Sequence, residues 1–113
     1  MRYSDIDTID RLWRRKGVFS KLEERYRKRI MKRFDWDRIE AELGEEGSVF
    51  VGSVSSIFPS GKFYTSWTTN QGAKDVLRDE TFGRVLDEIL ESKNIQWRSS
   101  EGDPCGVVFH RVQ

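Results

Sequence analysis

The chain has little cysteine and little histidine, and this scarcity excludes whole classes of site. Its 113 residues include one cysteine, Cys105, and one histidine, His110. A single cysteine cannot form a disulfide within the chain, and a chain without disulfides is typical of the cytoplasm, which is the setting we expect. Structural zinc sites use four Cys or His ligands. We therefore expect no metal and no other cofactor.

Long apolar runs are also missing. No stretch approaches the roughly 18 apolar residues of a membrane-spanning helix, and the first residues, MRYSDIDTID, are too acidic and polar for a signal peptide. Aromatic residues, in contrast, make up 12% of the chain and include four Trp. Such a composition predicts a folded core rather than disorder. The length favours a single domain over residues 1–113.

The net charge of +1 hides an uneven distribution. Residues 1–34 contain twelve Lys and Arg against five Asp and Glu, whereas residues 35–47 contain one Arg against six acids. The remainder, residues 48–113, has seven basic and eight acidic residues. A basic segment is therefore followed directly by an acidic one, and this switch of sign is the main functional signal in the chain.

Hydrophobic spacing predicts that residues 1–46 are helical. This helical part is first basic and then acidic. Helical spacing of Ile6, Ile9 and Trp13 predicts a first helix over residues 5–16, and Gly17 suits the position after it. Ser20 and Glu23 form a capping box that would begin the second helix.

The second helix has an apolar stripe that changes phase near Asp35. Leu22, Tyr26, Ile30 and Phe34 recur every four residues, but Trp36, Ile39 and Leu43 form a new stripe roughly opposite Phe34. The helix therefore either kinks near Asp35 or restarts there with Asp35 as its N-cap. Gly44 and Gly47 would end it.

Residues 47–113 have the composition of a β-β-α-β-β unit. We expect strands at SVFVGSVSSIF (48–58), KFYTSW (62–67), IQWRS (95–99) and CGVVFHRV (105–112), with turns at Pro59-Ser60-Gly61 and SEGDP. Phe82, Val85, Leu86, Ile89 and Leu90 predict an amphipathic helix at about residues 74–92. The fold class is thus α+β, with two N-terminal helices and a four-stranded antiparallel sheet.

The first strand predicts how the layers pack. Val49, Val51 and Ile57 would face one side and Phe50, Val54 and Phe58 the other, so both sides are apolar. A strand with two apolar faces is typically covered on both. We expect the helix at 74–92 on one face and the N-terminal helices on the other.

Two turn segments carry a resemblance to a known family. PSGKFY at residues 59–64 and EGDPC at residues 101–105 resemble segments of small uncharacterised proteins from phages and other prokaryotic mobile elements. The resemblance covers about residues 48–110 and implies a prokaryotic or viral origin. Gly106 departs from the family pattern, in which an acid is expected. The family has no known activity, so the resemblance implies no functional residue.

The segment KLEERYRKRIMKR, residues 21–33, is the strongest candidate for a binding site. Its basic side chains at spacing i, i+4, i+7, i+8 and i+11 share one helix face, and they are Lys21, Arg25, Lys28, Arg29 and Lys32. A row of cations binds phosphates by releasing condensed counterions, and Arg adds bidentate hydrogen bonds. Arg14 and Arg15 would extend the row around the preceding turn. We therefore predict a nucleic-acid partner.

Other interpretations of this row remain open from the sequence alone. It could be a solvated helix face, neutralised by the acids of residues 35–46, or a docking surface for an acidic protein. The acidic side chains of the third helix could also bind the basic helix of a second copy in a homodimer, and they are Asp75, Asp79, Glu80, Asp87, Glu88 and Glu91. A membrane surface is disfavoured because the adjacent acids would weaken attraction to anionic lipid.

A second binding candidate lies on the strand at 62–67. Lys62 and Tyr64 share one strand face, and an aromatic beside a cation on a strand is typical of sites that stack single-stranded nucleic acid. The same pattern is also typical of a buried aromatic on a half-covered sheet.

No catalytic group is predicted. Cys105 and His110 could form a nucleophile and base pair only if they met, but five positions along one strand would place them on opposite faces. A small enzyme stays open only because carboxylates alone can support some nuclease or hydrolase chemistry. We therefore expect a non-enzymatic binding protein of a mobile element or virus that contacts nucleic acid through the basic helix. The competing class is a protein-interaction module, either a homo-oligomer or an inhibitor of a host protein.

Overall fold

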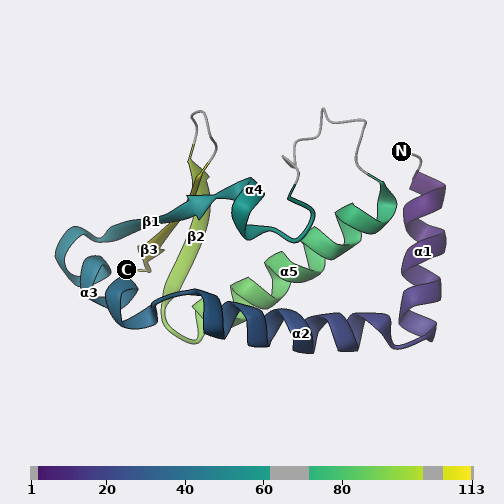
Figure 1. Cartoon of the computed structure of the whole chain (residues 1–113), viewed down its shortest axis with the longest axis horizontal. Helices are drawn as coiled ribbons and strands as arrows, with labels where there is room; N and C mark the ends of the chain where they lie inside the picture. The colour runs from purple at the N-terminus through teal and green to yellow at the C-terminus, as the bar shows by residue number, and fades with distance from the viewer. Residues whose placement is uncertain (1–2, 62–71, 101–105, 113) are drawn as a thin grey trace.

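The computed structural model describes residues 3–61, 72–100 and 106–112, and confirms the α+β class (Figure 1). Three helices come first: α1 (Tyr3–Arg15), α2 (Val18–Arg33) and α3 (Trp36–Glu46). Strand β1 (Ser48–Ser53) runs into the one-turn helix α4 (Val54–Ile57), and the long helix α5 (Ala73–Glu91) follows. Strands β2 (Ile95–Ser100) and β3 (Gly106–Arg111) complete the described chain.

The described strands form an antiparallel sheet in the order β1-β3-β2. Strand β3 lies in the centre, with Phe109 opposite Val49 on one side and opposite Trp97 on the other. The hairpin of β2 and β3 agrees with the sequence prediction. The expected fourth strand, residues 62–67, and most of the turn between β2 and β3 lie outside the described residues, so three of the four predicted strands are described.

The prediction of one strand over residues 48–58 is wrong beyond Ser53. The pairing of β1 with β3 shifts register between Phe50 and Gly52, and Gly52 has φ +147°. Ser53 then acts as an N-cap, because its Oγ accepts a hydrogen bond from the amide of Ser56 at 3.2 Å. A serine cap favours a helical turn locally, and this turn overrides the strand preference of Val54 and Ile57.

Helices α2 and α3 are separated at Asp35, which confirms a restart rather than a kink. Phe34 is extended, with φ −90° and ψ 135°, and it ends α2. The carboxylate of Asp35 then accepts a hydrogen bond from the amide of Arg38 at 3.2 Å and caps α3. Gly47, with φ +77°, ends α3, while Gly44 lies inside it.

The start of α2 differs from the sequence prediction. Gly17 has φ +70° and turns the chain between α1 and α2, and its carbonyl accepts a hydrogen bond from the amide of Lys21 at 3.3 Å. The helix therefore begins at Val18, and Ser20 lies within its first turn rather than at its cap. A left-handed glycine makes this sharp corner accessible without strain.

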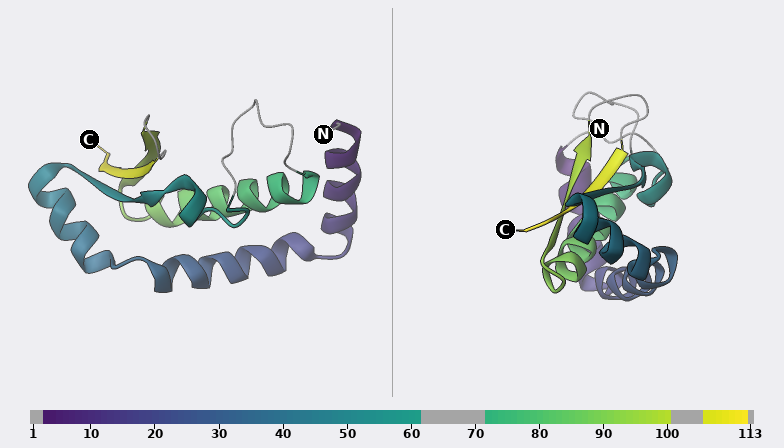
Figure 2. Two further views of the ribbon diagram at one scale, coloured as in Figure 1. Left: turned by 45° about the horizontal axis from the view of Figure 1, so that its top comes forward. Right: turned by 90° about the vertical axis from the view of Figure 1, so that its left-hand side faces the viewer.

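The helices pack on one face of the sheet, which corrects the expectation of a layer on each side (Figure 2). A single core joins Ile30 of α2, Leu43 of α3 and Leu86 of α5 to Val107 and Phe109 of β3. Phe50, which alternates with Val49 on β1, remains 55% exposed. Among the described residues, the opposite face of the sheet therefore has no helical layer.

Asp79 of α5 is buried, which removes it from the acidic side chains that could bind the basic helix of a second copy. It is 4% exposed, and its carboxylate accepts hydrogen bonds from the amide and the hydroxyl of Ser60 at 3.0 and 2.7 Å. Burial raises the pKa of Asp79, and the two hydrogen bonds from Ser60 partly oppose this. The carboxylate thus attaches the segment after α4 to α5.

Replacing Asp79 by Asn should change how stability depends on pH. Because burial raises the pKa of Asp79 in the folded state, its contribution to stability is fully present below the unfolded pKa of about 3.9 and is lost as pH rises through the folded pKa. The Asp79→Asn variant has no carboxyl group to ionise at this position. Its free energy of unfolding, compared with that of the original protein, should therefore rise as pH increases from the unfolded to the folded pKa of Asp79. Urea unfolding at a series of pH values measures this difference. Glu80→Gln, at an exposed neighbouring position, is the control, and parallel curves for Asp79→Asn would contradict the role given to this carboxylate.

Candidate nucleic-acid interface

Helix α2 is anchored by one apolar side, and this leaves the rest of its surface to solvent. Leu22, Tyr26 and Ile30 are 8%, 4% and 0% exposed, respectively. The ring of Tyr26 packs edge-on against Phe82 of α5, with 5.5 Å between centroids. This packing fixes the rotation of α2 about its axis. The positions of its cations relative to the rest of the molecule are therefore fixed as well.

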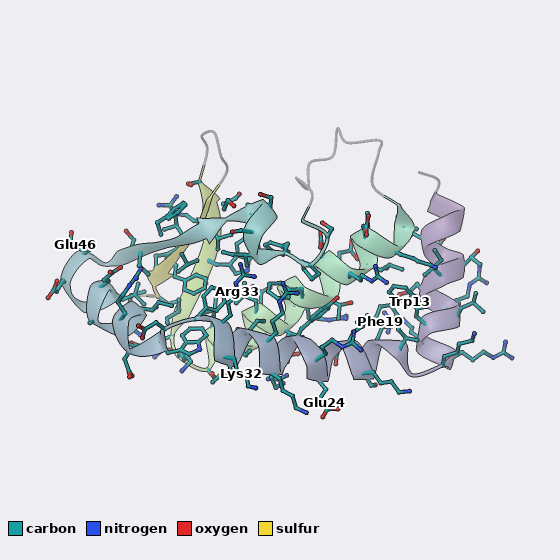
Figure 3. All side chains as sticks on the ribbon, in the orientation of Figure 1. Trp13, Phe19, Glu24, Lys32, Arg33 and Glu46 are labelled. Atoms are coloured by element: carbon teal, nitrogen blue, oxygen red, sulfur yellow. The ribbon has the colours of Figure 1, made fainter. Side chains whose placement is uncertain are left out.

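The five cations predicted on α2 are all exposed. They form a row along the helix and are Lys21, Arg25, Lys28, Arg29 and Lys32, here called the α2 row. Figure 3 shows Lys32 and Glu24 extending from the side of α2 that is turned away from the other elements. An α-helix rises about 1.5 Å per residue, so the row extends over about 16 Å. It is long enough to contact several consecutive phosphates.

Few carboxylates neutralise the α2 row. Lys28 forms an ion pair with Glu24 at 3.3 Å, in which both side chains are mostly exposed. Exposed pairs of this kind contribute little and are easily exchanged for another anion. No ion pair joins Lys21, Arg25, Arg29 or Lys32 to another residue within the part of the chain that the structure describes.

The acidic segment that follows α2 does not fold back over the row. Glu40 of α3 pairs with Arg111 of β3, and Glu42 pairs with Arg38 one turn earlier in the same helix at 3.3 Å. Helix α3 continues away from the end of α2 (Figure 1). In the described residues, the carboxylates of α3 form ion pairs with Arg38 and Arg111 and with none of the α2 row.

The two flanks of α2 differ in charge. On one flank Glu23 pairs with Arg84 of α5 at 3.3 Å, and Arg27 pairs with Glu88 of α5 at 2.7 Å. In each pair the two charges cancel, and both pairs connect α2 to α5. They do not include the α2 row, which therefore keeps its positive charge.

The other flank gathers arginines around Tyr26. Burial raises the pKa of Tyr26 and the charge of Asp79 adds to this rise, while the charges of Arg78, Arg29 and Arg25 oppose it. Arg78 comes from α5 and has Asp75 as a distant partner at 3.9 Å. Arg78 lies one turn before Phe82 on α5, and the Phe82 ring packs against Tyr26 of α2, so Arg78 adds a cation on the side of α5 that faces α2. Sequence spacing could not reveal it, because the contact joins residues from two separate helices.

Arg33 is a second basic residue that the sequence prediction did not place in the site. It is exposed, and it donates a hydrogen bond to the carbonyl oxygen of Ser56 in α4. Its label in Figure 3 lies between α2 and the elements above it. Arg33 therefore connects α2 to α4 while remaining next to the row. The sequence could have indicated this position, because Arg33 follows Arg29 by four residues and such residues are neighbours on a helix surface.

The predicted extension of the row through α1 is only partly supported by position. Arg14 pairs with Asp10 at 3.0 Å, and its guanidinium lies 5.0 Å from the ring centre of Phe19. Phe19 is buried on the inner side of α2, so Arg14 lies away from the outward face. Arg15 is exposed at the last position of α1. Arg15 is therefore accessible to a ligand, while Arg14 is already held by Asp10 and Phe19.

The remaining candidate residues lie away from α2 or outside the described residues. Lys62, Tyr64 and Cys105 lie outside the described residues, and His110 is partly buried on β3. Within residues 3–61, 72–100 and 106–112, no three His, Cys, Asp or Glu side chains gather to hold a metal ion. A hollow of about 500 Å³ beside β2 is lined in part by Asp87 and Glu91. Two carboxylates make this hollow unsuitable for phosphate.

Comparisons with known proteins add no relative: no family model, no curated protein and no solved structure matches the chain. The resemblance of the two turn segments to a mobile-element family therefore remains an expectation. No helix in the described part of the chain is long and apolar enough to cross a membrane.

Proposed function

We propose that the protein is a non-enzymatic binding protein, of a prokaryotic mobile element or virus, that contacts the phosphates of nucleic acid through the α2 row. The observation that supports this most directly is the exposure of five cations on a helix whose inner side is held in the core. Arg78 and Arg33 strengthen the positive charge of the same region. Phosphate contacts of this kind position a protein on nucleic acid without reading its sequence.

The alternative of a protein-docking face has less support. A protein interface usually has an apolar centre. The exposed large apolar side chains among the described residues are Leu12, Met31, Phe50 and Val112, and each comes from a separate part of the chain. Trp13 and Trp36 are partly buried and pack against the core. Single exposed apolar residues are normal at a protein surface.

The direct test is a salt titration of binding to labelled double- and single-stranded DNA and RNA, followed by fluorescence anisotropy. The double variant Lys28→Glu/Arg29→Glu should lose at least about tenfold in affinity at low salt, because two cations are replaced by charges that repel phosphate. Both positions are exposed, so the variant should fold. Circular dichroism checks that it does.

The matched control reverses two exposed cations elsewhere. Arg11→Glu/Lys74→Glu changes the net charge by the same amount, and both positions are exposed outside α2. We expect this control to bind much as the original protein does. Equal losses in the two double variants would mean that only net charge matters. Absence of binding by the original protein at low salt would contradict the proposal.

A further inference from the structure

The face of the sheet turned away from the helices has an ordered arrangement of side chains. Strand register places them in two rows that cross the three described strands, Ser48, His110 and Gln96 in one and Phe50, Val108 and Arg98 in the other. The residues that alternate with them, such as Val49 and Phe109, point into the core. Ser48, Phe50, Gln96 and Arg98 are exposed.

Phe50 is fixed on this face by a glycine. A Cβ atom at Gly106 of β3 would lie 2.0 Å from Cε2 of the Phe50 ring and 2.9 Å from Cδ2. Only glycine at this position allows the ring to rest directly on the backbone of β3. The Phe50 side chain nevertheless remains 55% exposed. The sheet therefore holds an aromatic ring in place from below while leaving it accessible to solvent.

We propose that this open face binds unpaired bases of single-stranded nucleic acid, with Phe50 as the stacking residue. Sheets that bind single strands use exposed aromatic side chains on which bases stack, beside cations that contact the backbone. Arg98 lies in the same row as Phe50, with Val108 between them. His110 and Gln96 in the neighbouring row supply hydrogen-bonding groups for base edges.

The charge of the face favours a nucleic-acid strand over a protein. The chain contains 19 Asp and Glu, yet none occupies a position of the two rows, and Arg98 contributes a positive charge. A stable protein interface buries about 800 Å² per partner, whereas the exposed large apolar side chains of this face are Phe50 and, two positions beyond His110, Val112. A second copy of the chain would place Arg98 against an equally positive face.

This inference concerns a surface separate from the α2 row. Ile30 and Phe34 of α2 pack against the core side of the sheet, and Figure 2 shows α2 and the sheet in separate layers. The two surfaces therefore have different selectivities. The α2 row recognises phosphates of any nucleic acid, while the open sheet face requires bases that are free to stack.

The test compares a labelled, unstructured oligothymidylate with a DNA hairpin of the same length, at a salt concentration that screens the α2 row. Phe50→Ala should weaken binding of the oligothymidylate by about 5- to 100-fold, the loss caused by removing one base–aromatic stack. Phe50→Tyr should retain binding, because tyrosine also stacks. Gly106→Ala should weaken binding without altering Phe50 itself, because the new methyl group displaces the ring.

The outcomes separate this inference from the proposed function. Equal binding of the oligothymidylate by Phe50→Ala and the original protein would overturn the inference, and so would equal losses on hairpin and single strand. Absence of oligothymidylate binding by the original protein would overturn it as well. If sedimentation shows that Phe50→Ala only dissociates a dimer, the occupant is a second copy and the inference is wrong. Loss of hairpin binding in Lys28→Glu/Arg29→Glu at low salt tests the α2 row alone.

Discussion

Phe109→Ala should lower the free energy of unfolding by about 3–5 kcal/mol. Phe109 is 0% exposed in the central strand, and its ring packs against Phe34 and Trp36, with 5.5 and 6.2 Å between ring centres. Truncation leaves a cavity where the end of α2, the start of α3 and the sheet meet. A domain of this size has a total stability of about 5–15 kcal/mol. Urea unfolding followed by circular dichroism measures the loss.

The control for this prediction is a second phenylalanine of the same sheet. Phe50→Ala removes the same group from a side chain that is 55% exposed, so it should cost about 1 kcal/mol or less. The comparison tests which face of the sheet is covered. Comparable losses at positions 50 and 109 would contradict the one-sided packing of the helices.

Neutralising the whole α2 row should remove most of the salt dependence of duplex binding. On duplex DNA each phosphate contact contributes about −0.9 to the slope of log K against log salt concentration. Glutamine removes the charge and nearly keeps the helix propensity of the replaced side chains. Substituting all five residues by Gln should therefore reduce the magnitude of the slope by about 4.5. The measurement is anisotropy over a range of salt concentrations, with single Gln variants to test additivity.

The control for the slope is Arg27→Gln. Arg27 lies on the same helix but is already paired with Glu88 at 2.7 Å. Its replacement should leave the slope nearly unchanged. A similar decrease in slope for Arg27→Gln and for single variants of the row would show that no particular face of α2 contacts phosphate. An unchanged slope in the fivefold variant would place the phosphate contacts elsewhere.

The helices were predictable from the sequence because their apolar stripes are long and regular. The spacing of Phe82, Val85 and Leu86 predicted α5 to within one residue at each end. The phase change at Asp35 correctly located the boundary of α2 and α3. Spacing alone could not distinguish a kink from a restart, because this depends on whether the Asp35 carboxylate bonds a backbone amide.

The errors have a common physical origin, which is competition between local patterns. Ser53 and Ser56 form a cap that ends β1, although the surrounding Val and Ile residues favour a strand. The two apolar sides of the first strand predict that Phe50 is covered, yet it rests on Gly106 at the surface. The charge of Asp79 predicts an exposed side chain, yet the carboxylate is buried and accepts two hydrogen bonds from Ser60. In each case a contact with a specific partner decided the outcome, and composition could not show it.

The sequence predicted the part of the candidate site that lies on α2, but not the contributions that depend on contacts with other elements. Helical spacing placed the five cations of the α2 row on one face, and all five are exposed. Arg78 approaches this region from α5, and Arg33 contacts α4. Contacts between elements depend on the tertiary packing of α2 against α5 through Tyr26 and Phe82, which spacing within one helix does not encode.

The restart at Asp35 has a consequence for how the molecule approaches a charged partner. The protein is elongated, with extents of 46 × 30 × 23 Å, and α3 lies toward one end of its long axis (Figure 1). Positive charge along α2 and negative charge on α3 are thereby held apart, which gives the protein a permanent electric dipole. A polyanion would meet a field that rotates the protein before contact, so the association rate should fall steeply with ionic strength.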